Sequence, residues 1–275
     1  MKQHKEHKFI FVGGLHRSGT TALYRLLGTD PRISIFSNTG VIEDEGQYLQ
    51  TVFPLEKEYG SVGQFALDPA SHWTEASEYV MPAKERLFDE WSSYWDLDKA
   101  VLAEKTPANL IRVRFLRAAF PNSTFIVMMR HPIAVIFASM KWRKIKTLSL
   151  EMMLENWIVA HQLMRNDLSF IPGNDYTILK YEEFCQNPSK FSGELGRVIG
   201  FKADLAYDSI RDGINARYFE KWKTGDYHLW STNSALKNWF KAKKNIINFR
   251  RIASQYESRI AEFGYSFSTI YDEVI

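Results

Sequence analysis

A turn with two glycines joins the first apolar segment of the chain to its first helical segment. Residues 9–12 read Phe-Ile-Phe-Val and predict a buried strand, and the pattern of Thr20–Leu27 predicts a helix. Between them, Gly14 and Gly19 have the glycine spacing of a phosphate-binding Walker loop. The backbone N–H groups of such a turn, with the helix N-terminus behind them, hold an anion. The chain is therefore constrained to contain a strand–loop–helix unit that binds an anionic group.

The positively charged residue of this loop differs in position from that of a loop that binds a nucleoside triphosphate, where a lysine directly follows the second glycine. Thr20 follows Gly19, and the positive charge comes earlier, at Arg17. Thr20 and Thr21 add two neighbouring hydroxyls. A kinase for a nucleotide or a small molecule is the main alternative, but it would need the missing lysine and an acidic partner for Mg²⁺ at a strand end. A tight turn with incidental polarity is the simplest alternative.

Short apolar runs alternate with helical patterns along the rest of the chain. We predict strands over 9–12, 101–103, 124–129 and 176–179, and helices over 20–27, 107–119, 132–144, 150–168 and 246–263. The run at 124–129 is continuously apolar, as in a parallel strand that is covered on both faces. This order predicts an α/β fold, in which helices flank a parallel sheet like that of P-loop nucleotide hydrolases.

We expect a single domain over residues 1–275, because no linker separates two units. Residues 8–50 and 100–200 would form its core. Residues 51–99 and 201–245 are interpreted as insertions that cap one edge of the sheet, and the C-terminal region is expected to be helical. Ligands of such folds bind beyond the carboxyl ends of the strands, so we look for chemistry there.

Composition narrows the class of protein. The 35 Lys and Arg against 32 Asp and Glu give a net charge of +3, which is too weak to indicate a nucleic-acid partner. A single cysteine, Cys185, excludes an internal disulfide and a cysteine-rich zinc site. No segment approaches the about 18 apolar residues that span a bilayer, and no leader-like apolar run follows the polar residues 1–8. We expect a cytoplasmic protein without a metal.

Three motifs together resemble those of the sulfotransferases that use 3′-phosphoadenosine 5′-phosphosulfate. Residues 17–21, Arg-Ser-Gly-Thr-Thr, match the 5′-phosphosulfate loop of that family. Residues 129–132, Met-Arg-His-Pro, match its later arginine signature, and residues 181–184, Tyr-Glu-Glu-Phe, match its Y-E-x-[LF] segment. The resemblance implies that the donor nucleotide is bound by Gly14, Arg17, Ser18, Gly19, Thr20, Thr21, Arg130, Ser139 and Tyr181.

In that family, the arginine and a serine on the following helix hold the 3′-phosphate. The family serine lies eight residues after the arginine. In this chain that position is Ala138, and Ser139 is one position later. Because neighbouring helix residues differ by about 100° in direction, a small rotation would bring Ser139 to the phosphate. A serine on a helix surface, and an ion pair of Arg130 with a carboxylate, are the plain alternatives.

The resemblance implies transfer of a sulfuryl group to a hydroxyl or amine, with adenosine 3′,5′-bisphosphate as the product. Such an in-line displacement needs little covalent chemistry from the protein, but it needs positive charge at the leaving oxygen. Arg17 in the loop and Lys105, after a predicted strand, are the expected cations, and no metal is required. A solvated lysine is the plain alternative for Lys105, and a non-catalytic binding module is a further alternative for the whole chain.

The resemblance leaves several candidates for the general base. Cytosolic small-molecule sulfotransferases place a histidine two residues after the lysine, where this chain has Pro107. Tyrosylprotein and bacterial relatives use a glutamate after the first helix, and Glu45 lies nearest that position, with Glu43 as the runner-up. An acidic helix N-terminus is the plain alternative for both. His16 and His72 remain as other candidates.

The acceptor is left open. The resemblance covers roughly residues 8–50 and 100–200, and it is weak over 55–100 and 205–245, the regions expected to choose the acceptor. A carbohydrate, glycolipid, phenol or peptide hydroxyl would fit.

Two further groups of residues have two interpretations each. Aromatic clusters at 72–73 and 91–95 either stack on an acceptor ring or pack helices together. Arg217, Lys221 and Lys223 either contact the 3′-phosphate, as a basic loop does in relatives, or belong to a solvated face.

Overall fold

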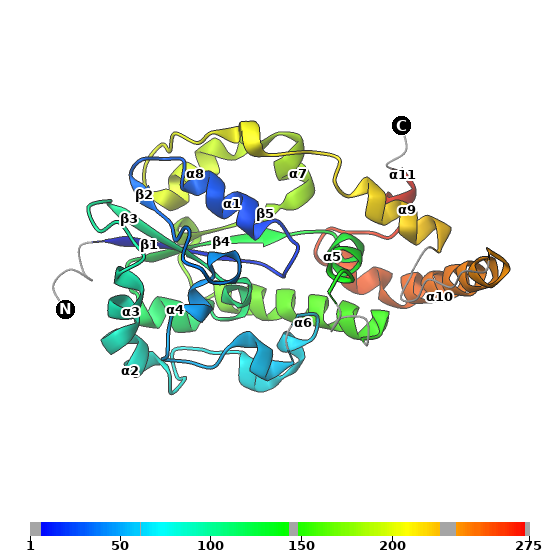
Figure 1. Cartoon of the computed structure of the whole chain (residues 1–275), viewed down its shortest axis with the longest axis horizontal. Helices are drawn as coiled ribbons and strands as arrows, with labels where there is room; N and C mark the ends of the chain where they lie inside the picture. The colour runs from blue at the N-terminus through cyan, green and yellow to red at the C-terminus, as the bar shows by residue number, and fades with distance from the viewer. Residues whose placement is uncertain (1–6, 61, 143–147, 226–234, 273–275) are drawn as a thin grey trace.

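The computed structural model describes residues 7–60, 62–142, 148–225 and 235–272. Its centre is a sheet of five parallel strands in the order β2-β3-β1-β4-β5 (Figure 1). The strands are β1 (Lys8–Gly13), β2 (Ile33–Ser34), β3 (Val101–Lys105), β4 (Ser123–Met129) and β5 (Tyr176–Lys180). The α/β fold with a parallel sheet is therefore confirmed, and β2 is a short strand that the sequence pattern did not reveal.

Helices cover both faces of the sheet, so the side chains of β1 are buried on both sides. Phe9 and Phe11 belong to one apolar core, and Ile10 and Val12 belong to the other, as the two-residue repeat of a strand requires. The helices of the second core are α1 (Thr20–Leu27), α7 (Tyr181–Gln186) and α8 (Ser192–Ile199) (Figure 1).

The first core contains the remaining helices, including those of the C-terminal region. They are α2 (Val80–Pro82), α3 (Phe88–Ser92), α4 (Val113–Ala119), α5 (Pro132–Ser139), α6 (Leu150–Leu168), α9 (Ala216–Thr224), α10 (Ala235–Ala261) and α11 (Thr269–Asp272). A π-helical turn over Ala83–Leu87 connects α2 to α3. In the described ranges, no helix has both the length and the apolar character needed to cross a membrane.

The aromatic cluster at 91–95 packs inside the protein against the sheet. The ring of Trp95 lies 5.9 Å from that of Phe9 in β1, and its Nε1 donates a hydrogen bond to the carbonyl of Ala103 in β3 at 2.8 Å. Trp91 is buried beside it. The helix-packing interpretation is therefore confirmed for these tryptophans.

The helix expected over 107–119 is broken into two pieces. A 3₁₀ turn covers Pro107–Ile111, Arg112 has a non-helical φ of −131°, and α4 begins at Val113. The guanidinium of Arg112 lies 3.6 Å from the centroid of the Trp73 ring, and both side chains are buried. The break therefore coincides with a contact between segments that are far apart in the sequence.

Two other helix boundaries differ from those expected. α5 ends at Ser139, before residue 144, and α10 begins at Ala235, well before residue 246. Four lysines lie between residues 235 and 245, and they interrupt the apolar repeat from which the start was predicted.

Candidate active site

The phosphate loop connects β1 to α1 in a backbone shape that its glycines allow. Gly14 has a φ of +149° and Gly19 has a φ of +102°, a region that favours glycine. A Cβ at Gly19 would lie 2.5 Å from Cδ2 of Tyr181, so a side chain there would displace that ring. Ser18 is buried, and its Oγ donates to a carbonyl of the loop at 2.6 Å. Arg17 is left-handed as well, with a φ of 67°, and its side chain is exposed.

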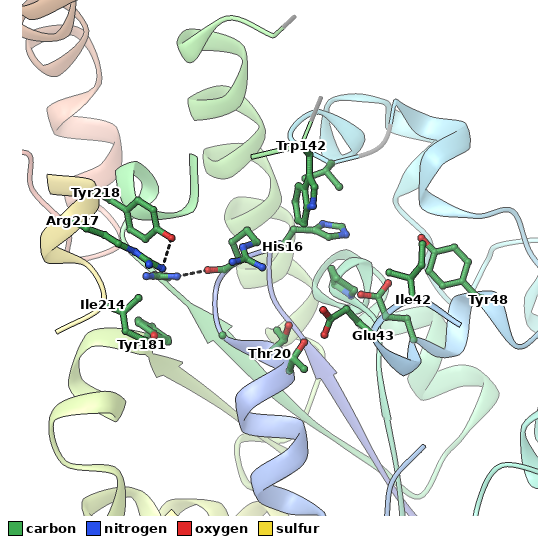
Figure 2. Close-up of a pocket in the computed structure, with 17 residues that line it drawn as sticks. His16, Thr20, Ile42, Glu43, Tyr48, Trp142, Tyr181, Ile214, Arg217 and Tyr218 are labelled. Carbon is green, nitrogen blue, oxygen red and sulfur yellow. Dashed lines mark hydrogen bonds between the residues drawn. The ribbon is translucent and has the colours of Figure 1, made fainter. Parts of the chain in front are cut away.

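A cavity of about 550 Å³ lies beside this loop (Figure 2). It is lined by residues that follow β1, β3, β4 and β5, which is where open parallel sheets bind their ligands. The sequence-predicted residues that line it are His16, Arg17, Gly19, Thr20, Thr21, Glu43, Glu45, Arg130, Tyr181 and Arg217. The phosphate loop, the later arginine and the acidic segment therefore share one cavity.

Four of the expected residues are not part of the cavity wall. Gly14 and Ser18 lie within the loop, and Lys105 is buried behind the wall. Ser139 donates from its Oγ to the carbonyl of Val135 in its own helix at 2.8 Å, and it borders a separate hollow of about 20 Å³. The rotation of α5 that would turn Ser139 into the cavity is not seen in this structure.

The cavity has two ends of different character, with Thr20 between them (Figure 2). The cationic end is defined by Arg130, Tyr181, Ile214, Arg217 and Tyr218. The carboxylate end is defined by Ile42, Glu43, Glu45 and Tyr48. His16 and Trp142 form a wall between the two ends, with their rings perpendicular and 5.8 Å apart.

Two arginines converge at the cationic end. The guanidinium of Arg130 lies 4.2 Å from the centroid of the Tyr181 ring, and its Nη1 donates to the carbonyl of Arg17 at 2.6 Å. Nη2 of Arg217 donates to the hydroxyl of Tyr218 at 2.8 Å (dashed lines in Figure 2). Burial lowers the pKa of Arg130 below its ordinary value of 12.5, which leaves it positively charged at neutral pH. This end of the cavity therefore suits an anionic group.

Glu45 and Lys105 form a buried ion pair at the carboxylate end. Oε1 of Glu45 lies 3.2 Å from Nζ of Lys105, and Oε2 accepts a hydrogen bond from Nε2 of Gln47 at 2.7 Å. Burial raises the pKa of Glu45, and the charge of Lys105 opposes this rise. A carboxylate with a raised pKa that faces a cavity suits the role of a proton acceptor.

A second buried carboxylate, Glu104, holds the backbone next to Glu45. Oε1 of Glu104 accepts hydrogen bonds from the backbone N–H of Gly46 at 2.9 Å and from Oγ1 of Thr106 at 2.6 Å. Oε2 accepts from Nδ2 of Asn109, also at 2.6 Å. Burial raises the pKa of Glu104 to about 7. This carboxylate links the end of β3 to the segment that carries Glu45.

The other candidate bases have different surroundings. Glu43 lines the cavity but is exposed. His16 lines it as well, and its Nδ1 lies 3.5 Å from Oε1 of Glu56. Burial lowers the pKa of His16 to about 3 and raises that of Glu56 to about 8, so at neutral pH His16 is uncharged and Glu56 mostly keeps its proton. His72 is not in the cavity wall, and its Nε2 lies 2.9 Å from Oδ1 of Asp167.

Several residues at the cavity were not found from the sequence, because no motif marks them. They are Ile42, Tyr48, Val62, Trp142, Ile214 and Tyr218 in its lining, and Glu56 beside His16. Of the three basic candidates in α9, Arg217 lines the cavity, whereas Lys221 and Lys223 do not. Among the residues that the structure describes, no three His, Cys, Asp or Glu side chains cluster in a way that could hold a metal ion.

Comparison with known proteins identifies a family match. A model of the sulfotransferase family matches residues 10–204. Among solved structures, a sulfotransferase from Mycobacterium tuberculosis superposes with a TM-score of 0.50 and 15% identity, covering 90% of this chain and 79% of that chain. A sulfotransferase from Alicyclobacillus acidocaldarius gives a TM-score of 0.49 and 16% identity, covering 89% of this chain and 99% of that one. At this level of identity, the first superposition supports a shared fold.

Proposed function

Because the chain belongs to the sulfotransferase family, we propose that it transfers a sulfuryl group from 3′-phosphoadenosine 5′-phosphosulfate to an acceptor hydroxyl and releases adenosine 3′,5′-bisphosphate. The observation that carries this proposal is the shared cavity. It is lined by the phosphate loop, by Arg130 and by Glu45. Phosphosulfate binding, 3′-phosphate binding and removal of the acceptor proton each need one of these elements.

We assign the donor to the loop and the cationic end. The backbone N–H groups of the loop and the hydroxyls of Thr20 and Thr21 would hold the 5′ phosphosulfate, and Arg17 would add positive charge. Arg130, whose Nη1 donates to the carbonyl of Arg17 in the loop, would pair with the 3′-phosphate. Tyr181, whose ring packs on Arg130, would hold that arginine in place.

A smaller hollow of about 140 Å³ shares Gly19, Tyr181 and Ile214 with the cavity. Most of its other walls are apolar, and they include Ala22, Met128, Phe184, Cys185 and Ile210. We place the adenine ring of the donor there, because an aromatic base prefers such walls while the phosphates stay among the cations.

Glu45 is assigned as the general base. It takes the proton of the acceptor hydroxyl while the acceptor oxygen bonds to sulfur and the bond from sulfur to the phosphate oxygen breaks. Negative charge then develops on the leaving phosphate, where Arg17 would meet it in the loop and Lys105 would add positive charge from behind the cavity wall. Protonation of Glu45 also removes the counterion of Lys105, so the lysine charge becomes available as the leaving group forms.

His16 is the second candidate base, since its uncharged ring faces the cavity. Its pKa of about 3 makes it a poor proton acceptor at neutral pH, whereas burial moves the pKa of Glu45 upward. This difference favours Glu45.

Nucleotide binding and turnover test the proposal. Adenosine 3′,5′-bisphosphate without Mg²⁺ should raise Tm more than adenosine 5′-phosphate does, and a ligand at 100 times its Kd stabilises a protein by about 2.7 kcal/mol. A kinase would respond instead to ATP with Mg²⁺, and that response alone would overturn the proposal. Transfer of label from the donor to carbohydrate, glycolipid, phenol and peptide acceptors would separate an enzyme from a binding module.

A further inference from the structure

The guanidinium of Arg130 is held by two uncharged groups. Its Nε and Nη2 both donate to Oδ1 of Asn215, at 2.8 and 2.5 Å, and its Nη1 donates to the backbone carbonyl of Arg17 at 2.6 Å. Arg130 is 5% exposed and Asn215 is 7% exposed. A guanidinium has five N–H donors, so in the described structure these three bonds leave two of them for a ligand.

Glu182, in the first turn of α7, stands behind Asn215. Its Oε1 accepts hydrogen bonds from Nδ2 of Asn215 at 2.7 Å and from the backbone N–H of His131 at 3.0 Å. Its Oε2 accepts from the hydroxyl of Tyr265 at 3.0 Å. The carboxylate therefore joins the start of α5, the start of α9 and the segment after α10 at the cationic end.

These contacts determine which way the amide of Asn215 points. Turning it over would place its NH₂ group against the N–H groups of Arg130 and its oxygen against the carboxylate of Glu182, and both contacts would be repulsive. The amide is thus a spacer between a cation and an anion. A carboxylate in direct contact with Arg130 would form a bidentate ion pair and would compete with a phosphate for the same charge.

We propose that Asn215 is a positioning residue that directs Arg130 toward the 3′-phosphate of the donor without neutralising it, and that Glu182 fixes the orientation of the amide. This inference rests on the proposed function, because it presumes that Arg130 binds the 3′-phosphate. It assigns a role to Glu182, the first glutamate of the Tyr-Glu-Glu-Phe motif, which the donor contacts do not otherwise use.

Asn215→Asp tests this role by replacing the NH₂ group of the amide with an oxygen. The new carboxylate would pair directly with Arg130 and would repel Glu182. The affinity for adenosine 3′,5′-bisphosphate should fall about tenfold or more, while the affinity for adenosine 5′-phosphate should change much less. Calorimetric titration of both nucleotides measures the Kd of adenosine 3′,5′-bisphosphate divided by that of adenosine 5′-phosphate, and this ratio should rise. Asn166→Asp, at an exposed position of α6, introduces the same charge away from the cavity and should leave this ratio unchanged.

Asn215→Ala provides a second variant in case the aspartate weakens folding. It removes the acceptor for two N–H groups of Arg130 and should also weaken adenosine 3′,5′-bisphosphate relative to adenosine 5′-phosphate, though by less than the aspartate does. A merely structural role would lower Tm and weaken both nucleotides equally, and equal weakening in either variant would overturn the inference. If the unaltered protein itself bound both nucleotides equally, the proposed 3′-phosphate site would fail, and that outcome is distinct from a failure of Asn215 alone.

Discussion

The two ends of the cavity hold their charges in opposite ways. At the cationic end, Arg130 donates to neutral oxygens, those of the Asn215 amide and of a loop carbonyl, so its charge remains available. At the carboxylate end, Glu45 is paired with Lys105 in a site where both side chains are buried. The first arrangement is suited to holding an anion throughout a reaction. The second is suited to accepting a proton during the reaction.

Burial has a different consequence at each end. An unpaired charge is costly in a protein interior, so a buried arginine needs hydrogen-bond acceptors even when it is reserved for a ligand. A buried carboxylate gains proton affinity instead, and this is the direction in which the pKa of Glu45 moves. The contrast predicts that variants at the carboxylate end affect turnover, whereas variants at the cationic end affect binding.

The largest effect is expected from Glu45→Gln. Glutamine keeps the size of the side chain but cannot take a proton, so kcat should fall by about 10²–10⁴ while donor affinity is retained. Steady-state kinetics with a separate nucleotide titration measures both. Glu43→Gln is the matched control. A severe loss in that variant, with a mild one at Glu45, would move the base by two positions, and mild losses in both would direct attention to His16.

Lys105→Met should have the next largest effect. It keeps the length of the side chain and removes the charge, so kcat should fall by on the order of 10² while the donor still binds almost normally. Arg17→Ala should lose both binding and turnover, because the loop arginine serves both. Lys105→Arg should restore little activity, since a planar guanidinium does not replace an ammonium at that position. A Lys105 variant with full kcat and a raised donor KM would place this lysine among the binding residues.

Arg130→Ala should affect binding at the opposite end. Loss of a buried, hydrogen-bonded charge partner typically costs about 2–5 kcal/mol, and this loss should appear in the affinity for adenosine 3′,5′-bisphosphate. The affinity for adenosine 5′-phosphate should fall far less. Arg217→Ala, from the same end of the cavity, is the comparison variant. If Arg130→Ala weakened both nucleotides equally, the arginine would not recognise the 3′ group.

The smallest effect concerns stability, at the buried carboxyl of Glu56 beside His16. Burial raises the pKa of Glu56 from 4.5 to about 8, so between these values the folded protein holds a proton that the unfolded chain releases. The free energy of unfolding should therefore fall as the pH rises through this window. His16 acts in the opposite direction below pH 6.5, because its pKa is lowered to about 3, so the comparison is cleanest above pH 6.5.

Urea unfolding between pH 6.5 and 8 measures this effect. Glu56→Gln removes the proton exchange, so its unfolding midpoint should decline less with pH than that of the unaltered protein. Glu85→Gln, at an exposed position, should decline as the unaltered protein does. The same decline in all three proteins would contradict the assignment of a buried proton to Glu56.

Local sequence patterns were sufficient for much of the fold. α1 and α6 begin and end where they were expected, because a helix depends on residues three and four positions apart and on caps such as Ser149 before α6. The apolar run of β4 marked a buried central strand for a similar reason. The break at Arg112 was not foreseen, since it coincides with a contact to the distant Trp73 that no local repeat records.

The sequence by itself determined the family motifs, the anion-binding loop and the candidate residues, all of which are local features. Only the tertiary structure decided which acidic residue is buried against Lys105, 60 positions away, and which amide orients Arg130 from 85 positions away. It also left Ser139 outside the cavity wall, hydrogen-bonded within its own helix. The physical reason is that the parallel sheet gathers the ends of distant strands at one edge, where loops meet without any periodic pattern in the sequence.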